Sequence, residues 1–155
     1  MKLYFDTCCY GRPFDNRAHR VQDRVRQEIT AIMDAIRVCN VSGFTIFGSA
    51  TVIAEMDDIA NDRKRVRVRN FYDRVISEEL TDTADIIDRA RDLNVLGLGL
   101  RDSYHVAFAE AAGVDYLLTT DDRFERTACR LDLKTKVINP INFFGEYAIW
   151  LLSSM

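Results

Sequence analysis

Apolar residues recur along this chain with two periods that alternate. Short runs such as Leu3–Phe5 and Tyr116–Leu118 are too brief for a helix and are typical of buried strands. The pattern predicts strands at residues 2–6, 44–47, 115–119 and 136–139. Longer segments between them repeat their apolar residues every three or four positions, as amphipathic helices do. This alternation predicts an α/β fold with a parallel sheet and helices on both of its faces.

The longer segments predict helices with recognisable ends. One helix is expected from a cap at Asp15 or Asn16 to about Cys39, and others at residues 50–60, 62–78, 83–93 and 101–112. Ser49 is a candidate N-cap, and Gly113 is a candidate stop because glycine accepts a left-handed backbone. The spacing of Asp122 and Glu125 is that of a capping box, which predicts Asp122 as the cap of a further helix. The last strand is expected to close at Pro140, and the apolar stretch 141–152 to cover a sheet edge or meet a partner subunit.

Composition narrows the class of protein. The 155 residues, 48% of them hydrophobic, are expected to form one domain, residues 1–155, with a substantial core. The net charge of −3 gives no indication of a nucleic-acid partner. Basic residues are frequent at positions 63–69, but they are distributed around the predicted helix. The pattern therefore does not decide between a solvated helix face and one that contacts RNA. No apolar run has the length of a membrane span and the start reads as a strand, so we expect a cytoplasmic protein without a signal peptide.

Acidic residues stand where the predicted strands end. Asp6 follows the first strand and Asp121 follows the strand at 115–119, while Glu55 and Asp57 lie on the helix after the second strand. Periodicity alone does not choose between Glu55 and Asp57. Because the capping box gives Asp122 a structural role, Asp121 is the better candidate of that pair. Parallel strands put their carboxyl ends at one edge of a sheet, where open α/β sheets place ligands.

Asp102 begins the helix expected at 101–112. It shares a helix face with Val106, Ala109 and Gly113, so its carboxylate is expected to point inward. A buried carboxylate must be paired, protonated or bound to a metal. His105 lies beside this face and is interpreted as a packed core residue rather than a base. Clustered acids without cysteine pairs suit Mg²⁺ or Mn²⁺ better than zinc.

The segments FDTCCY, SATVIAEM, RDSYHVAFAEAAGVDYLLTTDDRF and VINPINFF, in this order, resemble a PIN-domain ribonuclease. The resemblance covers essentially the whole chain. Its most specific part is Asp-x-x-His-x-Ala-x-Ala followed by Gly-Val-Asp-Tyr-Leu-Leu-Thr-Thr-Asp, which ends at Asp121. The insert CCYGRPFDNR is not fixed by the motif.

The resemblance implies a three-layer α/β/α sandwich around a mostly parallel sheet and a divalent-metal-dependent endoribonuclease acting on RNA. It also implies the toxin half of a toxin–antitoxin pair, a homodimer, and an antitoxin protein that covers the site. The positions that match the family's acids are Asp6, Glu55, Asp102 and Asp121, which favours Glu55 over Asp57. Thr7 and Thr119 stand next to matching positions and are expected to hydrogen-bond a ligand or a carboxylate.

Other protein classes fit the sequence less well. A haloacid-dehalogenase-like phosphatase needs a second acid two residues after its first, where this chain has Cys8. A phospho-receiver domain needs a lysine after its last strand but one, and Thr119-Thr120-Asp121 offers none. A PIN-like RNA- or protein-binding module without catalysis is the remaining alternative.

Overall fold

A computed structural model describes residues 1–16, 18 and 22–155 and contains a parallel sheet of five strands. Its order is β3-β2-β1-β4-β5, so β1 is the central strand. All four neighbouring pairs run parallel, with Tyr4 in register with Phe47 on one side and Leu117 on the other. The strands are β1 (Lys2–Phe5), β2 (Thr45–Ser49), β3 (Glu78–Leu80), β4 (Tyr116–Leu118) and β5 (Lys136–Ile138).

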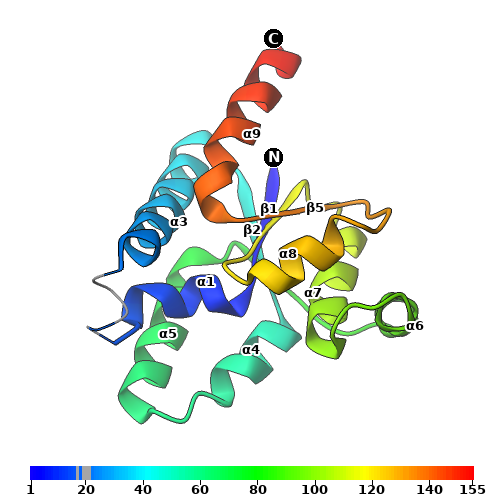
Figure 1. The fold of residues 1–155 in the computed structure, drawn as a ribbon, viewed down its shortest axis with the longest axis horizontal. Helices are drawn as coiled ribbons and strands as arrows, with labels where there is room; N and C mark the ends of the chain where they lie inside the picture. The colour runs from blue at the N-terminus through cyan, green and yellow to red at the C-terminus, as the bar shows by residue number, and fades with distance from the viewer. Residues whose placement is uncertain (17, 19–21) are drawn as a thin grey trace.

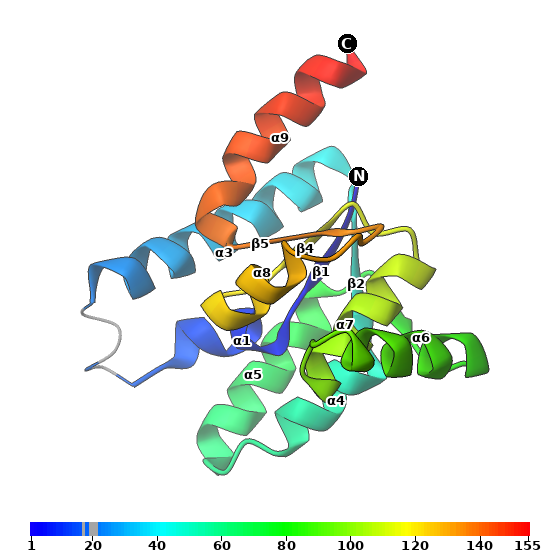
Figure 2. The ribbon, with the colours of Figure 1, turned by 45° about the vertical axis from the view of Figure 1, so that its right-hand side comes forward.

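Helices flank this sheet on both sides, which confirms the predicted α/β fold. Figure 2 shows the strands between a pair formed by α3 and α9 and another formed by α6 and α7. The described helices are α1 (Thr7–Gly11), the 3₁₀ helix η1 (Arg12–Phe14), α3 (Asp23–Ser42), α4 (Ala50–Asp57), α5 (Asp62–Val75), α6 (Ala84–Val95), α7 (Leu100–Ala111), α8 (Asp122–Ala128) and α9 (Pro140–Ser154). Figure 1 shows α9 extending away from the rest of the chain. None of the described helices combines the length and the apolar character that crossing a bilayer requires.

Several predicted elements differ from the structure. The long helix expected from residue 16 begins at Asp23, and residues 17 and 19–21 of that prediction lie outside the described residues. The helix predicted to reach residue 78 ends at Val75, because Glu78–Leu80 forms the edge strand β3. Pro140 does not close an element. It is the first residue of α9, where its fixed φ is compatible with a helix and its missing N–H would have no partner anyway.

The core is densest around β1. Leu3, Tyr4 and Phe5 are all buried, as expected for the middle strand of a sheet covered on both faces. Gly48 on β2 explains why α5 lies so close to the sheet, since a Cβ there would meet the Tyr72 hydroxyl at 2.0 Å. Gly113 ends α7 in a left-handed conformation with φ of 69°, as the sequence predicted. The sheet therefore holds β1 rigidly, and the end of β1 carries the first candidate site residue.

Candidate metal site

Asp6 follows the last residue of β1 and lies at the start of α1. It occupies the N-cap position of that helix, yet its side chain makes no capping hydrogen bond. Instead its Oδ2 accepts hydrogen bonds from the Thr119 hydroxyl at 2.8 Å and from the Cys8 thiol at 3.2 Å. Thr119 in turn follows β4, which pairs with β1. The predicted role of Thr119 as a carboxylate partner is therefore confirmed, and the two adjacent strand ends fix the orientation of Asp6.

His105 joins Asp6 to Glu55. Its Nε2 lies 2.5 Å from Glu55 Oε1 and 3.2 Å from Asp6 Oδ1, and its ring is fully buried. One ligand atom from each of these residues lies within 4.8 Å of the other two. His105 comes from α7 and Glu55 from α4, so two helices and β1 converge here. The interpretation of His105 as a packed core residue was right about its burial but missed its contacts with both acids.

A buried chain of hydrogen bonds holds the other side of the imidazole. The Tyr4 hydroxyl lies 2.7 Å from His105 Nδ1 and 2.6 Å from the Ser49 hydroxyl. Ser49 also accepts from the Val52 backbone N–H, which confirms the predicted cap of α4. Burial raises the pKa of Tyr4 well above its ordinary value, so the phenol keeps its proton. The ring of His105 is thus fixed from both nitrogens.

Two opposing effects determine the protonation of His105. Burial lowers the pKa of its imidazole, but the charges of Asp6 and Glu55 and the hydrogen bond to Glu55 outweigh burial, and the net pKa is raised. A protonated ring donates from both nitrogens, and the Tyr4 hydroxyl is then free to donate to Ser49. With the ring protonated, its positive charge lies between the two carboxylates and offsets part of their repulsion.

Asp102 belongs to the same electrostatic cluster. Its pKa is raised to about 6, first by burial and then by the charges of Asp6, Asp121 and Glu55, with His105 acting in the opposite direction. The other three acids predicted from the sequence therefore all act on Asp102. The carboxylate of Asp102 is partly buried and carries no hydrogen bond among the described residues. A nearby cation would relieve this repulsion.

The cap of α8 is not the acid that the capping box predicted. Asp121, not Asp122, is the N-cap, and its Oδ1 accepts from the backbone N–H groups of Arg123 and Phe124. Asp122 is the first helical residue and pairs with Arg24, which lowers its pKa. The capping-box prediction was wrong because the extended backbone that a cap requires falls one residue earlier, at Asp121. Asp121 also donates its own N–H to the Thr119 hydroxyl, which binds Asp6.

A cavity of about 360 Å³ opens beside the acids. Glu55, Thr7 and Cys8 line it together with the basic side chains Arg12, Lys64 and Arg101. The hydroxyl oxygen of Thr7 is buried and finds no hydrogen-bond partner among the described residues. The cavity thus places Glu55 next to basic side chains and next to the Thr7 hydroxyl, which has no partner there. Carboxylate oxygens dominate the donor set, so the residues present fit a hard divalent cation such as Mg²⁺ or Mn²⁺.

The sequence predicted only part of the candidate site. Asp6 and Glu55 both act on Asp102. Asp57, the alternative to Glu55 that the resemblance disfavoured, is exposed. The roles of Tyr4, Ser49 and Arg12 were not foreseen. Tyr4 was predicted only as a strand residue and Ser49 only as a helix cap, and the hydrogen bond between them depends on how β1 and β2 pair. His105 could have been found, because it lies one helical turn from Asp102 on the inward face.

Comparison with known proteins gives the family. The PIN domain model matches residues 3–129. A chain of the Rickettsia felis VapBC2 complex bound to a promoter DNA fragment is 16% identical, with a TM-score of 0.59 over 90% of this chain and 98% of that one. VapBC-1 from nontypeable Haemophilus influenzae is 13% identical, with a TM-score of 0.55 over 90% and 98%.

Mycobacterium tuberculosis VapC20, a toxin that cleaves the sarcin–ricin loop, is 15% identical, with a TM-score of 0.57 over 80% of this chain and 93% of that one. No curated protein matches the sequence. The identities are low, so the three structures establish the likeness of the fold, whereas the family match covers most of the chain. This chain belongs to the PIN domain family.

Proposed function

We propose that this protein is a divalent-metal-dependent endoribonuclease in which Asp6, Glu55, Asp102 and Asp121 hold Mg²⁺ or Mn²⁺. The observation that carries the proposal is the convergence of Asp6, Glu55 and His105 within 4.8 Å at the carboxyl ends of the strands. Asp102 supports it, because burial and neighbouring charges disfavour its ionised form unless a cation is present. Among the described residues, no other group of three histidines, cysteines or acids lies close enough together to hold a metal ion.

The protein's own groups orient the acids. Thr119 and Cys8 hold one oxygen of Asp6, while His105 faces its other oxygen and Glu55. A bound Mg²⁺ or Mn²⁺ would lower the pKa of a water molecule and offset the negative charge of a phosphodiester. Basic side chains line the adjoining cavity, where Arg12 and Lys64 pair with Asp15 and Arg101 pairs with Asp58.

We further propose that the protein is the toxin of a toxin–antitoxin pair and acts in the cytoplasm. Two of the similar structures are VapBC complexes, and the third is a toxin that cleaves RNA. The protein's α9 exposes apolar side chains, among them Ile149 at 61% and Leu152 at 74%. Exposed apolar surface of this kind favours a protein partner. We propose a homodimer and a small antitoxin as the partners.

Metal dependence tests the enzymatic proposal. Purified protein should cleave single-stranded RNA in Mg²⁺ or Mn²⁺, lose that activity in EDTA, and regain it when either metal is added in excess. Equal cleavage in EDTA would contradict the proposed metal site. RNA binding without cleavage in any divalent metal would favour the alternative, a PIN-like module that binds RNA or protein without catalysis.

A further inference from the structure

A groove lined by basic side chains leads from the metal site along α5. It consists of two adjoining cavities, of about 360 Å³ and 510 Å³, which share Asp15 and Lys64. The first touches Glu55 of the metal site, and the second reaches Arg63 and Arg67. Figure 2 shows α5 beside α1, the helix that begins at Asp6. The groove therefore continues from the acids over the first turns of α5.

The charges of the groove are balanced near the metal site and unbalanced farther along it. Asp15 accepts hydrogen bonds from Arg12 and from Lys64, both at 3.1 Å, so this carboxylate is neutralised within the protein. Arg63 and Arg67 are exposed and form no ion pair with any described residue. The distal part of the groove is consequently positive.

Other arginines of the same helix behave differently. Arg65 pairs with Asp62, and Arg69 pairs with Asp73. The sequence left open whether the basic segment is a solvated face or an RNA-contacting one. Within residues 63–69 the structure separates two pairs of arginines. Arg63 and Arg67 line the groove and lack acidic partners among the described residues, whereas Arg65 and Arg69 do not line it and have such partners.

Two polar groups near the metal site lack partners. The Thr7 hydroxyl oxygen and the Arg12 Nε are buried and form no hydrogen bond among the described residues. Both residues line the cavity that touches Glu55. A buried donor without an acceptor costs free energy, so an incoming acceptor would be favoured here. The oxygens of a phosphate are acceptors that suit an arginine N–H and a hydroxyl.

The second cavity also has an aromatic wall. Phe14 lines it and packs edge to face against Phe71, with ring centroids 5.9 Å apart. An aromatic side chain within a basic groove lets an unpaired base stack, which duplex RNA does not permit. Cations and an aromatic ring together favour a single strand over an acidic protein segment, which would need only the cations.

We propose that this groove binds the backbone of single-stranded RNA next to the cleaved bond. Thr7 and Arg12 contact a phosphate near the metal site, and Arg63 and Arg67 contact phosphates farther along the strand. The inference rests on the proposed ribonuclease function and assigns a path to its substrate.

Binding in EDTA tests the groove separately from cleavage. The affinity of a labelled single-stranded RNA is measured by fluorescence anisotropy between about 50 and 200 mM salt. The double variant Arg63→Gln/Arg67→Gln should bind about tenfold or more weakly at low salt. Its slope of log K against log salt should become shallower by about 1.4, since each phosphate contact on a single strand contributes roughly 0.7.

The matched control is Arg74→Gln/Arg130→Gln. Both arginines are exposed, form no ion pair among the described residues and do not line the groove, and the change in net charge is the same. The control should keep the wild-type slope. Equal losses in both double variants, or none in the groove variant, would overturn the proposed path.

Two further outcomes separate the possibilities. Wild-type protein that binds no RNA would contradict the proposed function itself. A groove variant that keeps full RNA affinity but no longer binds its antitoxin would assign the surface to a protein partner and overturn the RNA path. Thermal melting of each variant confirms that the fold is retained.

Discussion

The two ends of α7 show how differently this fold treats its acids. Asp102, in the first turn, has its pKa raised to about 6 by burial and by the neighbouring acids. Glu110, near the last turn, is also shielded from solvent, but hydrogen bonds from Arg89 and from the Lys134 backbone outweigh burial and lower its pKa. The described residues supply partners for the carboxylate of Glu110 but not for that of Asp102. Only Asp102 would therefore be stabilised in its ionised form by a bound metal ion.

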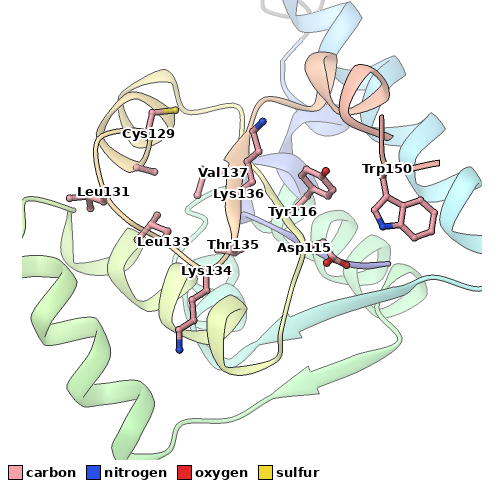
Figure 3. A pocket seen from close by; sticks show the side chains of 11 residues that line it. Asp115, Tyr116, Cys129, Leu131, Leu133, Lys134, Thr135, Lys136, Val137 and Trp150 are labelled. Atoms are coloured by element: carbon pink, nitrogen blue, oxygen red, sulfur yellow. The ribbon is translucent and has the colours of Figure 1, made fainter. Parts of the chain in front are cut away.

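Cavity size does not single out the candidate site, since a cavity of about 650 Å³ lined by residues of α6 and α7, among them Arg89 and Glu110, is larger than the one that Glu55 lines. A cavity of about 460 Å³ lies at the amino ends of β4 and β5, which exceeds the cavity of about 360 Å³ beside the acids. Figure 3 shows Leu131 and Cys129 on one side of β5 and Tyr116 and Trp150 on the other. Lys136 there is paired with Glu146, and Asp115 accepts a hydrogen bond from the Lys2 backbone N–H. The carboxylate of Asp102, unpaired among the described residues, and not cavity volume, distinguishes the candidate site.

Replacing one acid at each end of the sheet by asparagine should give the largest difference in metal affinity and RNA cleavage. We expect Asp6→Asn to reduce metal affinity and RNA cleavage by more than about 100-fold, because losing a direct ligand exceeds the roughly 10–100-fold effect of losing an outer partner. Asp115→Asn removes the same charge at the amino end and keeps an oxygen for Lys2, so it should retain near wild-type activity. Metal titration by calorimetry and single-turnover cleavage measure both effects. Comparable activity in the two variants would contradict the assignment of Asp6.

The sequence predicted the secondary structure correctly where the pattern within one segment determines it. The runs around Leu3 and Tyr116 predicted buried strands because these strands lie inside the sheet, where only apolar residues are stable. The edge strand β3 reads Glu-Glu-Leu, has little apolar content, and was predicted as the end of a helix. The positions of Asp6 and Asp102 followed from strand and helix ends, whereas the choice of Glu55 over Asp57 came from the family resemblance. The bonds among Tyr4, Ser49 and His105 depend on register between distant segments, which no local pattern contains.

Removing the Tyr4 hydroxyl tests whether the buried hydrogen bonds from Ser49 through Tyr4 to His105 support the metal site. We expect Tyr4→Phe to lower metal affinity about 10-fold to 100-fold, as for other partners of metal-binding groups. It should also cost about 1–3 kcal/mol of stability, because His105 and Ser49 lose a buried partner.

Tyr10→Phe is the matched control for this change. Tyr10 is also fully buried, but its hydroxyl forms no hydrogen bond among the described residues. Its removal should leave metal affinity unchanged and should not lower the melting temperature. If both variants lose metal affinity equally, the effect comes from packing in the core, and the hydrogen-bond chain has no specific role.

The smallest expected effects are opposite changes of stability at the two ends of α7. The folded pKa of Asp102 lies above its unfolded value, so ionisation destabilises the apo protein as pH rises from about 4 to 6. Asp102→Asn should therefore stabilise the metal-free protein by about 1–3 kcal/mol at pH 7. Glu110 has a lowered folded pKa, so its contribution is present above its unfolded pKa and is lost as pH falls through the folded one. Glu110→Gln should thus be less stable than wild type at pH 7, and this difference should shrink in acid. Melting temperatures in EDTA from pH 4 to 8 measure both, and a loss of stability in Asp102→Asn at pH 7 would show that its carboxylate is already satisfied without a cation.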